Sequence, residues 1–166
     1  MTKPDRREGR RALPRRLGVA GALVLAMAGG WLAIGGLIPA RGETMVVTMT
    51  PWCGCCGEWA DHMRAAGFDV TVVETDALDV AKQAAAIPTE LYSCHTAEIA
   101  GYVVEGHVPV PAIDKLLAER PAIDGIALAG MPPGSPGMGG AALKSYPVEA
   151  FRDGEAIGRF MDAPLR

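Results

Sequence analysis

Three of the four cysteines of the chain fall within four consecutive residues. They are Cys53, Cys55 and Cys56, and the fourth, Cys94, stands directly before His95. Thiolates are soft ligands that favour Cu(I), zinc and iron–sulfur clusters, and imidazole binds copper and zinc. Cys53 and Cys56 also have the C-x-x-C spacing of a dithiol redox centre. These residues therefore indicate either a metal site or a redox-active dithiol.

The spacing of the cysteines bears on which metal they suit. Cys55 and Cys56 are adjacent, and because adjacent side chains diverge, they chelate a single tetrahedral ion such as zinc poorly. They suit the bridging of different ions better, as does the close pair Cys53 and Cys55, which is too tight for an easy disulfide. The sulfurs and His95 could hold one to several Cu(I) ions. Zinc held by three thiolates and the imidazole, or by four thiolates, is an alternative, and so are two structural disulfides in an oxidising compartment.

Residues 1–40 have the pattern of an export signal. Six arginines precede residues 17–38, a run of 22 residues without a charge, and the small residue Ala40 marks a cleavage point. A retained anchor in the inner membrane is the alternative, because a run of this length can span a bilayer. In either case the basic end stays in the cytoplasm. We therefore predict that residues 41–166 are periplasmic, with membrane contact only through residues 17–38 if the leader is uncleaved.

The charge balance of the exported part limits its partners. Residues 1–40 hold 7 of the 16 Lys and Arg residues and 2 of the 19 Asp and Glu residues, so residues 41–166 carry a net charge of about −8. An acidic domain of this kind argues against a nucleic-acid partner and is compatible with a compartment that handles cations. The sequence also lacks a glycine-rich phosphate-binding motif.

The turn that carries Cys53, Cys55 and Cys56, called the cysteine turn below, is expected to lie between a strand and a helix. Residues 45–49 are short, β-branched and apolar, which predicts a buried strand. A helix should begin at Cys55 or Cys56 and end at Gly67, with a second strand over residues 68–74 that runs parallel to the first. The thiols would then stand at a helix N-terminus, where the helix dipole favours the thiolate form.

The rest of the chain continues this alternation and predicts an α/β fold. We expect further helices at residues 75–86 and 110–119, a loop rich in Gly, Pro and Met at 130–140 and a C-terminal β-hairpin at 146–160. Residues 97–105 predict either a hairpin that turns at Gly101 or one continuous, bent edge strand. The element order resembles a thioredoxin-like domain, with residues 41–166 as one domain, its core at about 44–120 and a C-terminal extension at 121–166. Under this resemblance Thr96, rather than Thr89, opens the third strand and brings Cys94 and His95 against the cysteine turn.

Four motifs in order extend the resemblance beyond the fold. They are Cys53-Gly54-Cys55-Cys56, Ser93-Cys94-His95-Thr96, the stretch from Gly101 to Pro109 and the stretch from Gly130 to Met138. Together they resemble the CopG-type family of exported, thioredoxin-like copper-associated proteins. The resemblance implies copper binding and copper resistance. It also implies that the clustered cysteines and the Cys-His pair are ligands or redox partners.

The candidate site residues follow from both lines of reasoning. The predicted copper ligands are Cys53, Cys55, Cys56, Cys94 and His95, and the further candidates are His107, Met131 and Met138. The alternative for His107 is a hydrogen-bonded turn residue. The alternative for Met131 and Met138 is that each is an apolar anchor for a lid. We expect Trp52 and Trp59 to flank the site and shield it from water, and His62 to lie on a solvated helix face.

The function predicted from the sequence is a periplasmic protein that sequesters Cu(I), cycles between Cu(I) and Cu(II), and contributes to copper resistance. One alternative is a thiol-disulfide oxidoreductase, with Cys53 as the catalytic nucleophile and Cys56 as the resolving thiol. Another is a copper metallochaperone that passes copper ions to other periplasmic copper-handling proteins, with Met131 and Met138 in the transfer loop.

Overall fold

A computed structural model of the protein describes residue 42 and residues 44–166. The export signal or anchor predicted for residues 1–40 lies outside this part of the chain. Within the described part, no helix combines the length and apolar character that crossing a membrane requires.

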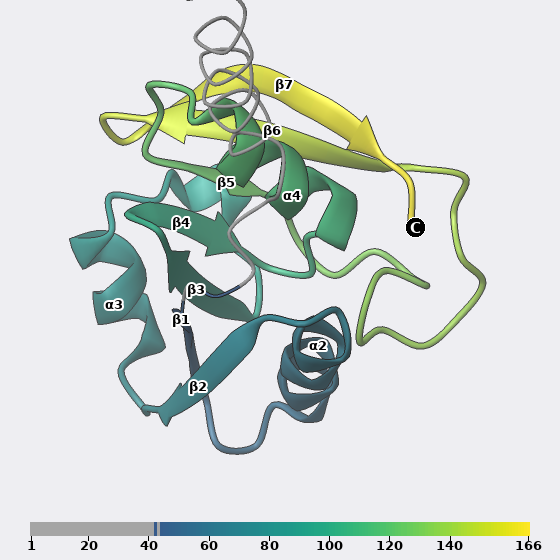
Figure 1. Cartoon of the computed structure of the whole chain (residues 1–166). Coiled ribbons are helices and arrows are strands. Elements are labelled where there is room, and N and C mark those ends of the chain that lie inside the picture. The colour runs from purple at the N-terminus through teal and green to yellow at the C-terminus, as the bar shows by residue number, and fades with distance from the viewer. Residues whose placement is uncertain (1–41, 43) are drawn as a thin grey trace, which may run out of the picture. The chain divides into compact units, whose positions relative to one another are not determined.

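A mixed sheet of seven strands forms the centre of the domain (Figure 1). The strand order is β2-β1-β3-β4-β5-β6-β7, with β1 parallel to β2, β4 parallel to β5, and every other neighbouring pair antiparallel. The strand bounds are β1 Thr44–Met49, β2 Asp69–Glu74, β3 His95–Ile99, β4 Tyr102–Glu105, β5 Gly125–Ala127, β6 Tyr146–Arg152 and β7 Glu155–Ala163.

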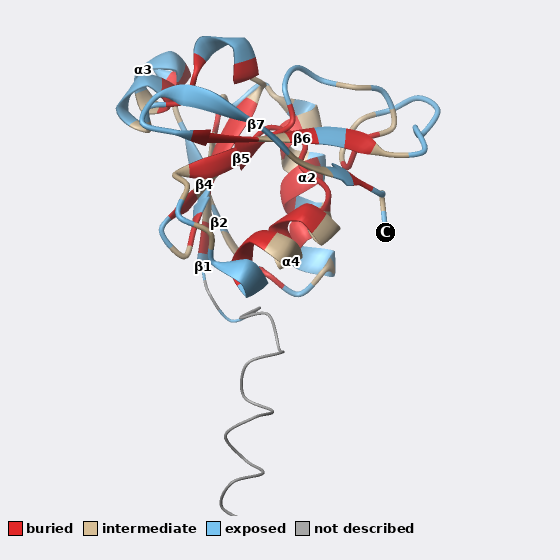
Figure 2. Ribbon diagram, turned by 90° about the horizontal axis from the view of Figure 1, so that it is seen from above, coloured by how far each residue is buried: buried red, intermediate tan, exposed pale blue. Residues whose placement is uncertain are grey.

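Three helices lie against this sheet, and they are divided between its two faces. Helices α2 (Gly54–Ala65) and α4 (Val110–Glu119) lie on one side, and α3 (Leu78–Ala84) lies on the other (Figure 2). A short 3-10 helix, η1 (Thr89–Leu91), leads from α3 toward β3. The fold therefore has an α/β architecture, as the sequence predicts.

The main core lies between the sheet and the helix pair α2 and α4. Alternate residues of β1 are buried, starting at Met45 and Val47, because successive strand side chains point to opposite faces of a sheet. Trp59 of α2 and Ile113 of α4 pack into this cluster and are fully buried. The Trp59 indole N–H donates to the backbone carbonyl of Val108 over 3.1 Å, so the polar atom of this buried ring is satisfied.

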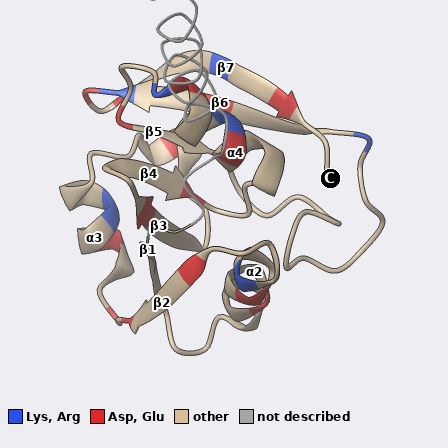
Figure 3. Cartoon of the chain, in the orientation of Figure 1, with Lys and Arg blue, Asp and Glu red and all other residues tan. Residues whose placement is uncertain are grey.

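Charged residues of both signs cover the outside of the domain. Figure 3 shows acidic residues on α2, β2, α4 and β7, with basic residues on the same helices and on β7. Several of these charges form exposed ion pairs, such as Lys115 with Glu119 on α4 at 2.9 Å. Exposed pairs of this kind contribute little to stability, about 0–1 kcal/mol each.

Most predicted elements are present, with shifted ends. The parallel pairing of β1 with β2 and the C-terminal hairpin are as predicted. Helix α2 begins at Gly54, one or two residues earlier than expected, and the second hairpin strand runs on to Ala163. The three-residue strand β5 was not predicted, because a segment this short has no periodicity to detect.

We expect Ile113→Ala to lower the free energy of unfolding by about 2–5 kcal/mol, because the change leaves a cavity in the main core. The matched control is Ile157→Ala on the edge strand β7, where the side chain is 48% exposed and the loss should be below about 1 kcal/mol. Urea unfolding followed by circular dichroism measures both. Equal losses would contradict the position of the core.

Candidate metal centre

Strand pairing brings the two cysteine segments together. Cys53 lies at the N-cap position of α2, just beyond the end of β1, and its backbone N–H donates to the carbonyl of Thr50 over 3.1 Å. In the antiparallel register of β1 with β3, His95 is opposite Met49, the last residue of β1. Cys94 therefore lies next to the cysteine turn, as the choice of Thr96 over Thr89 for the strand start predicts.

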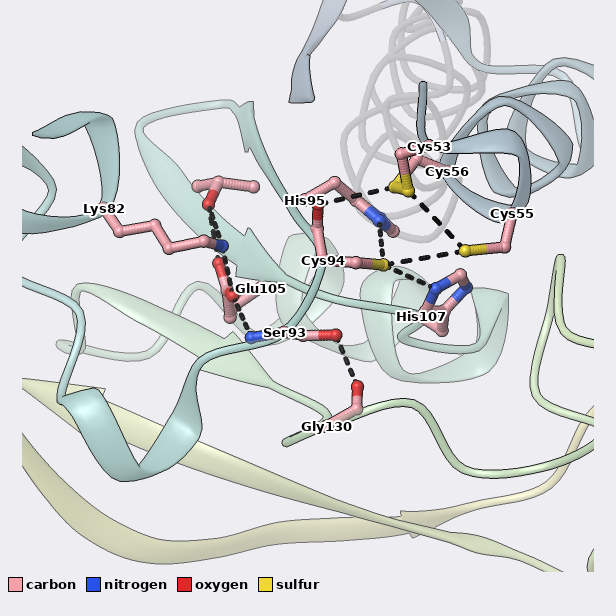
Figure 4. Close-up of polar contacts among 11 residues, drawn as sticks. Cys53, Cys55, Cys56, Lys82, Ser93, Cys94, His95, Glu105, His107 and Gly130 are labelled. Atoms are coloured by element: carbon pink, nitrogen blue, oxygen red, sulfur yellow. Dashed lines mark hydrogen bonds and ion pairs between the residues drawn. A yellow bond between two sulfur atoms is a disulfide. The ribbon is translucent and has the colours of Figure 1, made fainter. Parts of the chain in front are cut away.

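The sulfur atoms form a compact group at the first turn of α2 (Figure 4). Cys53 and Cys56 are joined in a disulfide, whereas Cys55 and Cys94 are free. The Sγ atom of Cys55 lies 3.6 Å from that of Cys53 and 4.0 Å from that of Cys94. The Sγ atom of Cys56 lies 3.4 Å from the backbone carbonyl oxygen of Cys94. Two structural disulfides, one of the alternatives from sequence, are thus not formed among these cysteines.

His107 is held in an orientation typical of a metal ligand. The Nε2 atom of His107 is 2.8 Å from the Sγ atom of Cys94, and its Nδ1 atom is 2.7 Å from the carbonyl oxygen of Pro136. Because a carbonyl oxygen can only accept, Nδ1 carries the proton and donates it, which leaves the Nε2 lone pair facing the thiol. A ligating histidine commonly has its other nitrogen fixed by a backbone carbonyl in this way.

His95 is fully buried between the sulfur group and the core. Its Nδ1 atom lies 3.5 Å from the Sγ atom of Cys94, and its ring centroid is 4.5 Å from that of Trp59. Its Nε2 atom has no hydrogen-bond partner among the described residues. A buried ring nitrogen without a partner is uncommon and marks a place where a ligand fits. The chemistry of the donors, sulfur and imidazole, suits copper or zinc.

The electrostatics of the site favour neutral imidazoles. Burial holds the pKa of His95 well below its ordinary 6.5, and the nearby His107 and the charge of Lys82 lower it further. Burial also lowers the pKa of His107, although its hydrogen bond to the Pro136 carbonyl raises the pKa by a smaller amount. Both rings are therefore uncharged at neutral pH, with one ring nitrogen free of a proton, which is the form that binds a metal.

The thiol of Cys94 is kept protonated in the absence of a metal. Burial raises its pKa from 9.0 to about 12, and the adjacent Cys55 contributes to this shift. The S–H group can then donate to Nε2 of His107, which lies 2.8 Å away. A metal that binds here must displace this proton, so binding releases protons and weakens as the pH falls.

Two possible ligand groups share one residue. The first is Cys53, Cys55, Cys56 and Cys94, and the second is Cys94, His95 and His107; within each group the ligand atoms lie within 4.8 Å of one another. Every cysteine and histidine of the predicted ligand set is therefore in one place, together with the further candidate His107. Reduction of the disulfide would make all four sulfurs available to the first group.

The Gly/Pro loop contacts the site through its backbone. Ser93 Oγ donates to the carbonyl of Gly130, and the carbonyl of Pro136 accepts from His107. Gly137 lies so close to α2 that a Cβ atom there would be 2.6 Å from the Cys55 carbonyl oxygen, at a φ of +80° that favours glycine. The sequence did not indicate this orienting role of Pro136, because a backbone carbonyl has no residue signature.

The two methionines of this loop and the two tryptophans near the site differ in burial. Met131 is 54% exposed and Met138 is half-buried. Trp59 packs on His95 as expected, but the prediction that Trp52 shields the site is wrong, because this side chain is 72% exposed. Trp52 lies in the turn between β1 and α2.

Two charged residues beside the site were missed by the sequence analysis. Lys82 of α3 and Glu105 of β4 are both buried and form an ion pair. The buried residues of α3 are Leu78 and Lys82. The i, i+4 spacing from Leu78 to Lys82 was the available signal, but lysine is almost never fully buried without a partner.

Two solved structures are similar to this chain, and both are of copper resistance protein CopG. Form 2 is 37% identical with a TM-score of 0.67, and the match covers 74% of this chain and 99% of that chain. Form 1 is 38% identical with a TM-score of 0.67, and the match covers 74% of this chain and 98% of that chain. The chain belongs to the CopG family.

The other comparisons with known proteins add less. A family described as a protein of unknown function, DUF411, matches residues 91–138, a segment that holds Cys94, His95, His107 and most of the Gly/Pro loop. No curated protein matches the chain. Membership of the CopG family confirms the resemblance found from the sequence motifs, and the protein is a CopG-like copper resistance protein with a clustered cysteine and histidine site.

The stability of the metal-free protein is expected to fall as the pH is lowered from about 7 to 5. The folded rings of His95 and His107 have a pKa below 6.5, so below this pH the unfolded state binds more protons than the folded state. Each ring then adds a slope of up to about 1.4 kcal/mol per pH unit. Urea unfolding at several pH values measures the slope, which His107→Gln should make shallower. Stability that rises on acidification would contradict the buried neutral rings.

Proposed function

We propose that this protein sequesters Cu(I) in the periplasm and so contributes to copper resistance. The observation that carries the proposal is the position of Cys94, which belongs to both ligand groups. A thiolate can bridge two metal ions, so one shared sulfur allows a small ligand set to hold more than one ion. The two similar structures are of a copper resistance protein, which supports the same metal.

The donor set favours Cu(I) over zinc. Cys55 and Cys56 differ in their surroundings, since Cys55 is half-buried near Cys94 while Cys56 is fully buried in its disulfide. A single tetrahedral ion needs its ligands to converge, whereas several Cu(I) ions of low coordination number accept divergent sulfurs. The buried imidazoles of His95 and His107 would add nitrogen ligands beside Cys94.

Redox cycling is the second part of the proposal. The C-x-x-C pair is present as a disulfide, and a dithiol there can supply two electrons. Two thiols and two Cu(II) ions would yield one disulfide, two Cu(I) ions and two protons. Cys55 and Cys94, which remain free, would retain Cu(I) after the step. The site would in this way produce the oxidation state that its sulfur ligands prefer.

Export of the domain rests on the leader pattern of residues 1–40 and on the disulfide. A disulfide persists in oxidising compartments such as the periplasm and is uncommon in the cytosol.

We also propose that the domain is thioredoxin-like. The C-x-x-C pair at the start of α2 and the sheet order β2-β1-β3-β4, with β1 parallel to β2 and antiparallel to β3, support this assignment.

Titration of the reduced, anaerobic protein with Cu(I) against a chelator tests copper binding. We expect more than one tightly bound Cu(I) per chain, because two ligand groups are present. Cys94→Ser should remove most of the binding, since it disrupts both groups. Cys55→Ser and His107→Gln are the matched controls, and each should weaken only one group. Absence of Cu(I) binding by the unmodified protein would refute the proposed function.

A thiol-disulfide oxidoreductase is the second candidate, favoured by the disulfide between Cys53 and Cys56 at the N-terminus of α2. Cys53 is half-buried whereas Cys56 is buried, so Cys53 is the more exposed cysteine of the pair.

An insulin-reduction assay separates the two candidates. If exchange with partner proteins is the main activity, the protein should catalyse turnover that Cys53→Ser abolishes, because this change removes the exposed nucleophile. Cys94→Ser should leave that turnover intact, since Cys94 is outside the disulfide. No turnover by the unmodified protein would exclude this candidate.

A further inference from the structure

A buried ion pair lies on the α3 side of the sheet, behind the sulfur group. The Nζ atom of Lys82 is 2.5 Å from Oε1 of Glu105, and the two residues are 1% and 0% exposed (Figure 4). Lys82 comes from α3, a helix that contributes no residue to either ligand group. Glu105 is the last residue of β4 and stands two residues before His107.

Stability alone does not account for this pair. Taking two charges out of water costs several kcal/mol each, and apolar side chains of similar volume in place of such a pair are often neutral or stabilising. The chain has apolar residues available on this face, since Ile87 and Leu91 form a small cluster with Phe151 there. A buried pair in such surroundings points to a geometric role.

The remaining contacts of Glu105 show what it holds. Its Oε1 atom accepts from the backbone N–H of Ser93 over 2.5 Å, and its Oε2 atom accepts from Oγ1–H of Thr96 over 2.6 Å. Ser93 and Thr96 are the residues directly before and after the Cys94–His95 pair. The Glu105 carboxylate therefore accepts hydrogen bonds from the residues on both sides of Cys94–His95, the dipeptide that supplies a thiol and an imidazole to the site.

Lys82 completes this arrangement. Its Nζ atom also donates to Oγ1 of Thr96 over 3.0 Å, which fixes the hydroxyl so that its proton points to Glu105. Thr96 is 4% exposed, so water does not compete for these bonds. The ammonium thus neutralises the carboxylate and orients one of its donors at the same time.

The backbone around the dipeptide leaves it little freedom. The N–H of Gly106 donates to the carbonyl of His95 over 3.0 Å. Gly106 has a φ of +75°, and a Cβ atom there would lie 2.5 Å from the Cβ atom of Ser93. The segment after Glu105 is therefore packed directly on Ser93, and a shift of the carboxylate would move the Cys94 backbone with it.

We propose that Glu105, with Lys82 as its counter-charge, is a positioning residue that fixes Cys94 and His95 in the geometry for binding Cu(I). The proposal rests on the proposed copper function. Glu105 acts from the opposite face of the sheet and does not touch the metal. Its effect on binding is transmitted through the hydrogen bonds to Ser93 and Thr96.

The direct test is the Cu(I) affinity of Glu105→Gln, measured by competition with a chelator. Glutamine keeps the shape but cannot accept at both positions, so we expect affinity 10–100-fold weaker, about the effect of other residues that orient metal ligands. The control is Glu119→Gln, which breaks the exposed pair with Lys115 and should change affinity less than twofold. An unchanged affinity in Glu105→Gln would overturn the proposal.

A double-mutant cycle separates positioning from a general loss of stability. If Glu105 acts by placing Cys94, then Glu105→Gln should weaken the residual copper binding of Cys94→Ser much less than it weakens that of the unmodified protein. An equal weakening in both backgrounds would mean that the carboxylate acts elsewhere, and would overturn the proposal.

A measurement without copper distinguishes failure of this proposal from failure of the copper function. Amide hydrogen exchange at Ser93 should be at least tenfold faster in Glu105→Gln, while exchange at Val47 in β1 stays unchanged. Unchanged exchange at Ser93 would overturn the positioning role, whatever the protein binds. If Glu105→Gln does not fold, Thr96→Val removes the two side-chain hydrogen bonds of Thr96, to Glu105 and from Lys82. We expect a three- to tenfold loss of Cu(I) affinity, and no loss would overturn the proposal.

Discussion

The antiparallel pairing of β3 with β1 is the interaction on which the rest of the site depends. It sets His95 opposite Met49, and so brings Cys94 to the end of the strand that leads into the cysteine turn. Because side chains alternate along a strand, a shift by one residue would turn His95 to the α3 face and Thr96 to the core. The same register therefore places the imidazole among the sulfurs and the threonine beside Glu105. A single pairing therefore places both the candidate ligands and the side chains that hydrogen-bond beside them.

Burial gives this site its chemical character. Withdrawing the imidazoles of His95 and His107 from water keeps them neutral, and withdrawing Cys94 keeps its thiol protonated until a metal replaces the proton. Both effects arise because charged forms are disfavoured away from water. The metal-free site is consequently close to electrically neutral, although the domain around it is acidic. Metal binding at this site would then depend on ligand softness and proton release rather than on attraction between a cation and a charged cluster.

How far the sequence predicts this protein depends on how local each signal is. The strand, turn and helix around Cys53 follow from a short apolar run and a helical pattern, and the family follows from four ordered motifs. The role of Pro136 could not be predicted, because any residue offers the same carbonyl. Lys82 and Glu105 were missed because their pairing joins residues that are far apart in the sequence, and because each alone resembles a solvated surface residue. Trp52 was misplaced since adjacency to a cysteine does not determine which way a turn residue faces.

The hydrogen bond from His107 to the Pro136 carbonyl has an evolutionary consequence. Since the acceptor belongs to the backbone, the loop can change many of its side chains and still orient the ring, provided that its length and path are kept. The close contact of Gly137 with α2 constrains that path. Selection would then preserve the loop length up to Pro136 and the glycine at position 137. The side chains at exposed loop positions could be substituted without moving the His107 ring. Related proteins are therefore expected to vary in side chains such as Met131 while they retain a loop of the same length.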